Sequence, residues 1–314
     1  MTNRILVTIA VASIGLASGP VSAARRYSDW STPAYFAAVN TAALEFANAI
    51  SKDGLSFYFQ RGDAASTDPA AREDIWVVQR PSRDEDWGEP RRLSDNVNSG
   101  ANERAAFVSP DGHRLYFASD RPGGRGGLDL MVSWRPHVHE DFGELGWQPA
   151  RNLDDLGSAV NTPGFESGPA IFRDDEAGTV QLYFVSNPTG GQASADVYRS
   201  FQNDDGSFGT PMPVTELNSP SSEGRPYLRH DGLEIYFQSN RPTGKGGFDI
   251  WVSTRTATDQ PWSAPESVPV VNTAANDLTP VLSWDGRTLF IASNRTGSGG
   301  EVFFSTREKV HGEP

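Results

Sequence analysis

The chain has 314 residues, no cysteine, and a formal net charge of −13 from 27 basic and 40 acidic residues. The lack of cysteine excludes disulfide bonds, a lipid-attachment cysteine and a thiol nucleophile. No basic tract is present to replace phosphate counterions, so the composition argues against nucleic acid and anionic membrane surfaces and leaves cations, sugars and basic proteins as partners.

The first 23 residues predict a cleavable secretory signal. Arg4 precedes an apolar stretch at residues 5–16, and Val21, Ser22 and Ala23 stand before Ala24. The apolar stretch is too short for a membrane span. We therefore expect a periplasmic or secreted protein without membrane insertion, with one folded domain at residues 25–310.

A five-residue interval from an asparagine to an acid recurs along the rest of the chain. Successive asparagines lie 54 to 63 residues apart, and such a period is typical of repeat architectures. The pairs are Asn40 and Glu45, Asn98 and Glu103, Asn161 and Glu166, Asn218 and Glu223, and Asn272 and Asp277.

Each unit contains the signals of four strands. An aspartate follows eight residues after each acid, and four of the five are followed by glycine, which favours a tight turn between two strands. A β-branched and aromatic run follows the turn, and a third run opens with an acid. An aromatic residue and a proline then indicate an outer edge strand, where the missing proline N–H is tolerated. The aspartates are Asp53, Asp111, Asp174, Asp231 and Asp285.

Five units of four antiparallel strands predict an all-β protein, a single five-bladed β-propeller. We expect blades at residues 43–94, 101–154, 164–217, 221–269 and 275–307. The last unit lacks its fourth strand, while Trp30 and Pro33 precede Asn40 at the interval seen between units. We therefore expect residues 28–38 to complete the last blade and close the ring, which removes its open edges.

The second and fourth units resemble the propeller repeat of TolB and related domains of bacterial envelope proteins. The resemblance is carried by residues 109–112, 115–117, 119–122 and 126–130 and by the matching residues 239–242 and 246–250. It covers almost the whole domain and implies the propeller fold, which hosts binding, scaffolding and several kinds of catalysis. The third unit departs from the pattern with Pro188 at the arginine position, and the first has Gln60 and Arg61 there.

The loops that carry the Asn and acid pairs are expected on one face of the disc, together with the loops between second and third strands. This places Arg121, Arg241 and Arg295 around an acidic ring. In one interpretation the five acids converge at the channel mouth, where they hold a cation such as Ca²⁺ or act as the acid, base or nucleophile of a glycoside hydrolase or lyase. In the other, each acid serves a contact that every blade needs. The candidates are Glu45, Glu103, Glu166, Glu223 and Asp277.

Residues that break the repeat are further candidates for ligand binding. Arg104 follows Glu103, Arg225 lies two residues after Glu223, and Phe165 precedes Glu166. The two arginines can hold a carboxylate-bearing ligand or can neutralise the acids beside them.

Two weaker patterns involve histidine and tryptophan. His137 and His139 lack a third ligand at metal-binding spacing, so they favour a solvated loop over a metal site. Three tryptophans can stack on sugar rings or belong to the core between sheets. These are Trp134, Trp147 and Trp284.

The sequence thus leads first to a recognition or scaffold module that binds a protein or glycan through the acidic face. The alternative is a carbohydrate-active enzyme that uses the inner-strand carboxylates. We expect a monomer with no cofactor other than a possible Ca²⁺ ion at the channel mouth.

Overall fold

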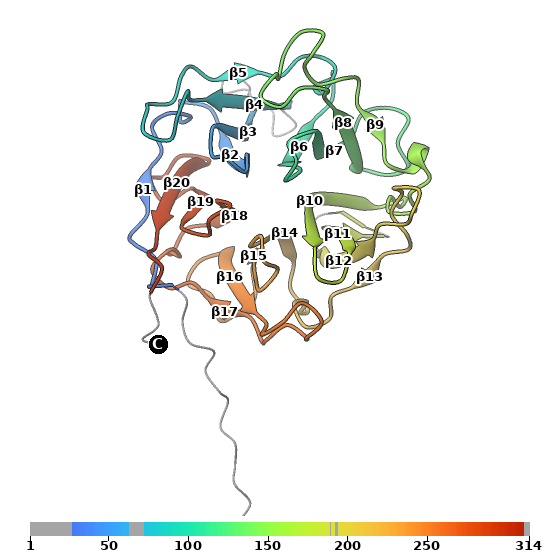
Figure 1. Cartoon of the computed structure of the whole chain (residues 1–314). Coiled ribbons are helices and arrows are strands. Elements are labelled where there is room, and N and C mark those ends of the chain that lie inside the picture. Colours follow the sequence, from blue (N-terminus) through green and yellow to red (C-terminus); the bar gives the residue numbers. More distant parts are fainter. Residues whose placement is uncertain (1–26, 63–71, 189, 192–193, 311–314) are drawn as a thin grey trace, which may run out of the picture.

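The computed structural model describes residues 27–62, 72–188, 190–191 and 194–310, and these form five four-stranded antiparallel sheets around a common axis (Figure 1). The expected signal sequence lies outside the described residues. The prediction of an all-β, five-bladed propeller is confirmed.

The strands follow one another from the axis outward in each blade. Blade one contains β2 (Glu45–Ile50), β3 (Ser56–Gly62), β4 (Glu73–Gln79) and β5 (Arg91–Arg92). Blade two contains β6 (Glu103–Val108), β7 (Arg114–Ser119), β8 (Asp129–Trp134) and β9 (Arg151–Asn152). Blade three contains β10 (Phe165–Asp174), β11 (Thr179–Asn187), β12 (Asp196–Phe201) and β13 (Met212–Pro213). Blade four contains β14 (Glu223–Leu228), β15 (Glu234–Ser239), β16 (Asp249–Thr254) and β17 (Glu266–Ser267).

The fifth blade is built from both ends of the chain. It contains β18 (Asp277–Leu282), β19 (Thr288–Ser293) and β20 (Glu301–Thr306), and its outer strand is β1 (Ala34–Tyr35). Ala34 lies opposite Phe304 and Tyr35 opposite Phe303, so β1 covers the edge of β20 as Figure 1 shows. The expected closure by an N-terminal strand is confirmed, and it occupies backbone groups that would otherwise form an exposed edge.

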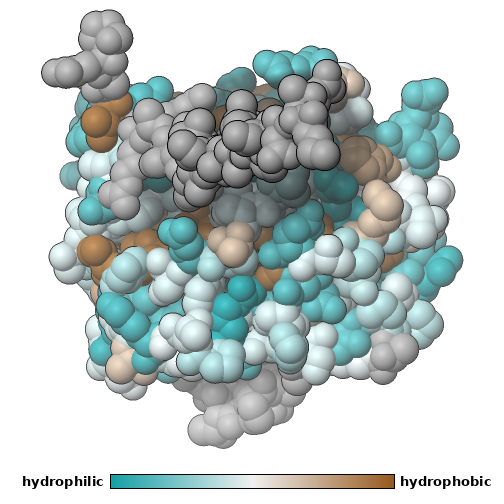
Figure 2. All heavy atoms as spheres, turned by 90° about the horizontal axis from the view of Figure 1, so that it is seen from below, coloured by the Kyte–Doolittle hydropathy of each residue, from teal (hydrophilic) through white to brown (hydrophobic). Residues whose placement is uncertain are grey.

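The hydrophobic core lies between neighbouring blades. Second strands supply rings that are 0% exposed, including Phe59, Phe117, Phe184 and Phe237, and these pack in clusters shared with a neighbouring sheet. The surface in Figure 2 is mostly hydrophilic or neutral, with apolar residues scattered singly or in small groups. Stability therefore comes from interblade burial, as a chain without disulfides requires.

A 3₁₀ turn, η1 (Asp154–Leu156), lies between β9 and β10. No described helix has the length and apolar character needed to cross a membrane.

Candidate functional site

Each repeated acid stands at or next to the start of an inner strand and is buried. The five side chains are 0–1% exposed, although the strands that carry them surround the axis. The residue after each repeated asparagine supplies both its N–H and its hydroxyl to the carboxylate. In blade two, Ser99 donates to Glu103 from N at 2.8 Å and from Oγ at 2.6 Å. Thr41, Thr162, Ser219 and Thr273 bind the other four acids in the same way.

Three of the predicted arginines, each in the loop after a second strand, bind these acids. Arg121 Nη2 donates to Glu103 Oε1 at 3.0 Å and to the carbonyl oxygen of Val97 at 2.5 Å. Arg241 and Arg295 bind Glu223 and Asp277 and the matching carbonyl groups in their own blades. The arginines therefore join the loops before the inner strands to the loops between second and third strands. We call the face formed by these two sets of loops the mouth face.

Blades one and three vary this contact. In blade one Arg61, directly opposite Glu45 in the ladder, donates to Glu45 at 2.9 Å and to the carbonyl oxygen of Val39 at 2.8 Å. In blade three, whose sequence has proline at the arginine position, Glu166 receives the Ser186 hydroxyl at 2.7 Å. Burial raises the pKa of Glu45 and Glu166, against the lowering effect of their hydrogen bonds.

The repeated asparagines join consecutive blades. Asn98 Oδ1 accepts from the N–H of Ile75 at 2.8 Å, and its Nδ2 donates to the carbonyl oxygens of Ile75 and Leu93. The other four make the same pair of contacts with the third strand of the preceding blade: Asn40 with Val302, Asn161 with Leu130, Asn218 with Val197 and Asn272 with Ile250. Each asparagine thus hydrogen-bonds to the third strand of the preceding blade, and each acid is hydrogen-bonded within its own blade.

These contacts favour the interpretation in which each acid serves its own blade, and the catalytic assignments stay predictions. Calcium binding at the mouth also stays a prediction. Among the described residues, no three His, Cys, Asp or Glu side chains come together as a metal site.

The space left on the axis is a small cavity lined by all five inner strands. Its volume is about 10 Å³. Each inner strand bulges here, with register irregularities between Arg104 and Phe107 in β6 and at the matching places in β2, β10, β14 and β18. Three non-glycine residues at these bulges have left-handed backbone angles: Ala105 at φ 59°, Arg225 at 52° and Thr279 at 49°. Such strain is sparse in proteins and concentrates at constrained or functional sites.

The charged groups at the cavity mouth are three, and none belongs to the repeated acids. Arg104 Nε lies 2.6 Å from Glu73 Oε2, and Gln60 Nε2 donates to the same oxygen at 2.9 Å. Arg225 Nη2 donates to Gln60 Oε1 at 2.6 Å and to Asn48 Oδ1 at 3.1 Å. The two arginines predicted from the sequence therefore meet around one carboxylate.

Burial dominates the electrostatics of this cluster. It raises the pKa of Glu73, although Arg104 and Arg225 act to lower it. The pKa of Arg225 is lowered to about 9, chiefly by burial, with Glu73 acting to raise it and Arg104 acting to lower it. With two cations and one anion, the cluster keeps one positive charge at the centre of an acidic protein.

An aromatic pair also lies at the cavity. Tyr227, which lines it, packs with its ring centroid 5.6 Å from that of Phe107, and burial raises the pKa of Tyr227 well above the usual value. We call the axial cavity, with Arg104, Glu73 and Arg225 at its mouth, the cup.

The remaining sequence candidates lie away from this cup. Phe165 is 8% exposed and packs in the core that spans blades two to four. His139 pairs with Asp53 at 2.8 Å, between a loop of blade two and the hairpin of blade one. Trp147 is 1% exposed and belongs to the core, whereas Trp134 is 48% exposed. Trp284 stacks on His230 at 5.0 Å on the opposite face.

A second repeated contact, on the face opposite the mouth, was missed by the sequence patterns. Arg135 Nε donates to the carbonyl oxygen of Gly112 at 2.7 Å and lies 4.3 Å from the ring centroid of Trp147. The same contact joins Arg80, Gly54 and Trp87, then Arg255, Gly232 and Trp262, and finally Arg307, Gly286 and Trp30. The contact occurs in the four blades that have the Asp-Gly turn. The sequence signal that could have predicted it is an arginine directly after the third strand of each of these blades.

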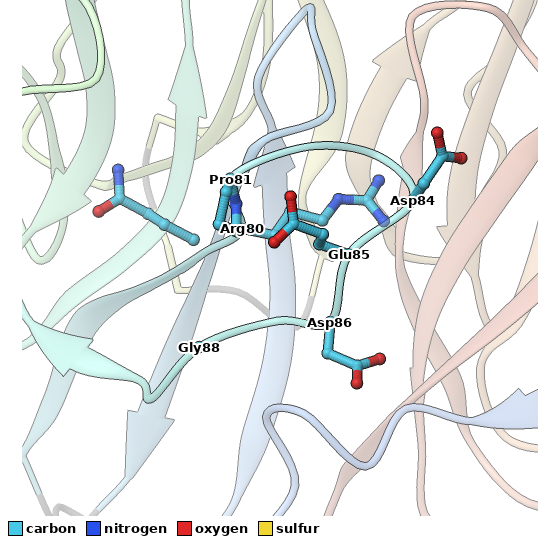
Figure 3. A pocket seen from close by; sticks show the side chains of 7 residues that line it. Arg80, Pro81, Asp84, Glu85, Asp86 and Gly88 are labelled. Atoms are coloured by element: carbon cyan, nitrogen blue, oxygen red, sulfur yellow. The ribbon is translucent and has the colours of Figure 1, made fainter.

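A wider depression of about 850 Å³ lies over the loop between β4 and β5. Asp84, Glu85 and Asp86 line it, and Figure 3 shows Asp84 and Asp86 pointing apart. All seven lining residues belong to this one hairpin, so the depression is the surface of a loop and carries no assembled site.

Comparisons with known proteins support the propeller fold and assign the chain to no family. No family model matches the chain, and no curated protein matches its sequence. A thermostable family-43 glycoside hydrolase is similar in structure at a TM-score of 0.57 and 14% identity, over 89% of this chain and 94% of that one. The RS223 β-xylosidase is similar at a TM-score of 0.55 and 13% identity, over 90% of this chain and 96% of that one. TolB from Acinetobacter baumannii is similar at a TM-score of 0.49 and 13% identity, over 86% of this chain and 56% of that one. At these identities the similarity shows the propeller fold alone.

Proposed function

We propose that this protein is a recognition module of the bacterial envelope, periplasmic or secreted, that binds a protein or glycan partner through its mouth face. It acts as a monomer in this proposal, with the half-buried arginines Arg104 and Arg225 around the cup as its first contacts.

The burial of the five repeated carboxylates carries the proposal. A glycosidase needs two carboxyl groups that flank the scissile bond, and each must reach the substrate. Here the five side chains are 0–1% exposed and are engaged by hydroxyl, amide or guanidinium donors. The cavity of about 10 Å³ is also far below the ~300 Å³ of typical ligand pockets. A binding surface is therefore better supported than a catalytic funnel.

Arg104 is the residue from which we expect most of the effect on binding. Its side chain is 29% exposed at the cup, and its ion-pair partner is Glu73. A partner carboxylate or hydroxyl group can approach it without breaking a blade contact, and arginine offers a planar fork of donors for such groups.

Photo-crosslinking in the producing cells tests the proposal for a protein partner. A crosslinking amino acid at position 104 should give one discrete adduct, which mass spectrometry identifies. Position 114 is the control, because Arg114 is also exposed but begins β7 at the opposite face. The purified partner should then bind Arg104→Ala at least about fivefold more weakly than Arg114→Ala, at equal melting temperatures.

A polysaccharide panel tests for a glycan partner. Binding by interferometry that weakens in Arg104→Ala, without released products, supports recognition. Equal binding by Arg104→Ala and Arg114→Ala in both assays would show that the mouth face is not the contact.

A carbohydrate-active enzyme is the second candidate, and Glu73 is the observation in its favour. Its carboxyl group lies at the cup mouth with a raised pKa, which is what a general acid requires. Chromatography of the same panel should show no products if recognition is the function. Turnover that is lost in Glu73→Gln, or in a Gln variant of Glu45, Glu103, Glu166 or Glu223 or in Asp277→Asn, with the fold intact, would establish the enzyme instead.

A further inference from the structure

The axial cavity has two buried polar atoms without a hydrogen-bond partner among the described residues. They are Nδ2 of Asn48 and Oγ1 of Thr279, whose residues are 4% and 6% exposed. Both residues line the cavity, one from β2 and the other from β18. Buried polar groups are normally satisfied, so each such atom in a native structure requires an explanation.

The cavity is lined by donors. Asn48 Nδ2 can only donate, and the Thr279 hydroxyl can donate by rotation about its C–O bond. Arg225 adds a cation to the same wall. The two amide oxygens nearest to this guanidinium, on Asn48 and Gln60, already accept from Arg225 Nη2. Among these side chains a cation would find one unengaged oxygen, the Thr279 hydroxyl, whereas an anion would find three kinds of donor.

The charge balance also favours an anion. Among the described residues, Glu73 is the carboxylate that acts on Arg225, and it is itself engaged by Arg104 and Gln60. Arg225 is left without a carboxylate within ion-pair distance among the described residues, and its lowered pKa reflects a buried charge that lacks full compensation.

The size of the cavity selects the class of anion. About 10 Å³ accommodates one water-sized particle. Phosphate, sulfate and organic carboxylates have several heavy atoms and do not fit inside the ring of inner strands. A monatomic halide is somewhat larger than a water molecule, and it is the class of anion closest to the size of this cavity.

We infer that the propeller axis is a binding site for a single halide ion, chloride under physiological conditions, held by Arg225, Asn48 Nδ2 and Thr279 Oγ1. The site goes beyond the proposed recognition function, because it needs no partner. The ion joins the inner strands of blades one, four and five and neutralises the charge that the fold places on its axis.

Bromide diffraction tests the position of the ion. Crystals soaked in sodium bromide should show an anomalous peak on the axis, within about 3.5 Å of Asn48 Nδ2 and Thr279 Oγ1. The peak should be clearly weaker, at the same bromide concentration, in crystals of Thr279→Val, which keeps the shape of the side chain and removes the hydroxyl group. A peak for water alone, with no anomalous signal on the axis, would overturn the inference.

Thermal melting tests the energetics in solution. At matched ionic strength, sodium chloride and bromide should raise the melting temperature above that in sodium gluconate, because a ligand bound only by the native state stabilises it. Loss of one hydrogen bond to an ion should weaken halide binding by Thr279→Val about tenfold. Thr254→Val, at an exposed threonine at the end of β16, is the control and should keep the full halide effect.

Arg225→Met should remove the halide effect altogether, since it removes the charge. If this variant does not fold, Thr279→Val still decides the question. An equal halide effect in Thr279→Val and Thr254→Val would refute the site.

Discussion

Asn98 and Ile75 form a closed pair of hydrogen bonds between blades one and two. The asparagine accepts the Ile75 N–H at 2.8 Å and donates to the Ile75 carbonyl oxygen at 3.0 Å. An amide side chain thus takes the part of a neighbouring strand for the Ile75 N–H, whereas the Ile75 carbonyl oxygen also accepts from the Leu93 N–H.

Asn98→Ala should therefore destabilise the protein by about 2–4 kcal/mol, because it leaves the buried Ile75 N–H without its partner and removes hydrogen bonds to the carbonyl oxygens of Ile75 and Leu93. Urea denaturation measures the change. Asn203→Ala, at an exposed hairpin, is the control and should change stability by less than about 1 kcal/mol. Equal effects at the two positions would contradict the role of Asn98 in joining blades.

Glu103 and Glu166 occupy the same place in two blades but differ in their cationic partner. Glu103→Gln should cost about 1–3 kcal/mol, because Arg121 loses the carboxylate that it contacts at 3.0 Å while remaining 81% buried. Glu166 has no arginine partner, and burial raises its pKa, so Glu166→Gln should cost clearly less. Chemical denaturation of the two variants compares them directly. A larger loss for Glu166→Gln would refute the assigned contacts.

The hairpin aspartates should give the protein part of its acid sensitivity. Burial acts to raise the pKa of Asp111, but the Ser109 hydroxyl and the His113 N–H hold it below the usual value. Because the folded-state pKa is the lower one, this carboxylate stabilises the fold above the unfolded value of about 3.9, and the contribution is lost as pH falls through the folded pKa.

The melting temperature of Asp111→Asn should therefore lie below that of the wild type near pH 7, and the gap should narrow as pH falls from about 5 toward 3. Asp86→Asn, on the exposed loop of Figure 3, is the matched control for removing one surface charge. A gap that stays constant over this range would show that the Asp111 charge does not stabilise the hairpin.

Ring closure should depend on Trp30. This side chain is 9% exposed, lies 4.4 Å beneath the Arg307 guanidinium and meets Tyr236 edge to face. Trp30→Ala should destabilise the protein by about 3 kcal/mol or more, because it opens a cavity where the N-terminal segment joins the last blade. Trp134→Ala, whose ring is 48% exposed, should cost much less by calorimetry. Similar melting temperatures for the two variants would argue against closure through Trp30.

The sequence by itself determined the number of blades, the strands within them and the closure of the ring. These follow from local signals: the period between asparagines, the Asp-Gly turns and the alternation of β-branched and aromatic runs. Trp30 and Pro33 predicted the closure, because they match the aromatic and proline segment that the last unit lacks. Because the same residues recur at the same places in each blade, the sequence was enough to predict the strands and turns without coordinates.

Only the tertiary structure decided which charged groups face the axis. Arg225 meets Gln60 across 165 residues of sequence, and Glu73 joins Arg104 from a different blade. The repeated acids looked exposed because inner strands border a channel, yet hydroxyl and arginine side chains from their own blades enclose them. Burial and the convergence of distant side chains depend on how five sheets pack around one axis, and no local pattern contains that packing.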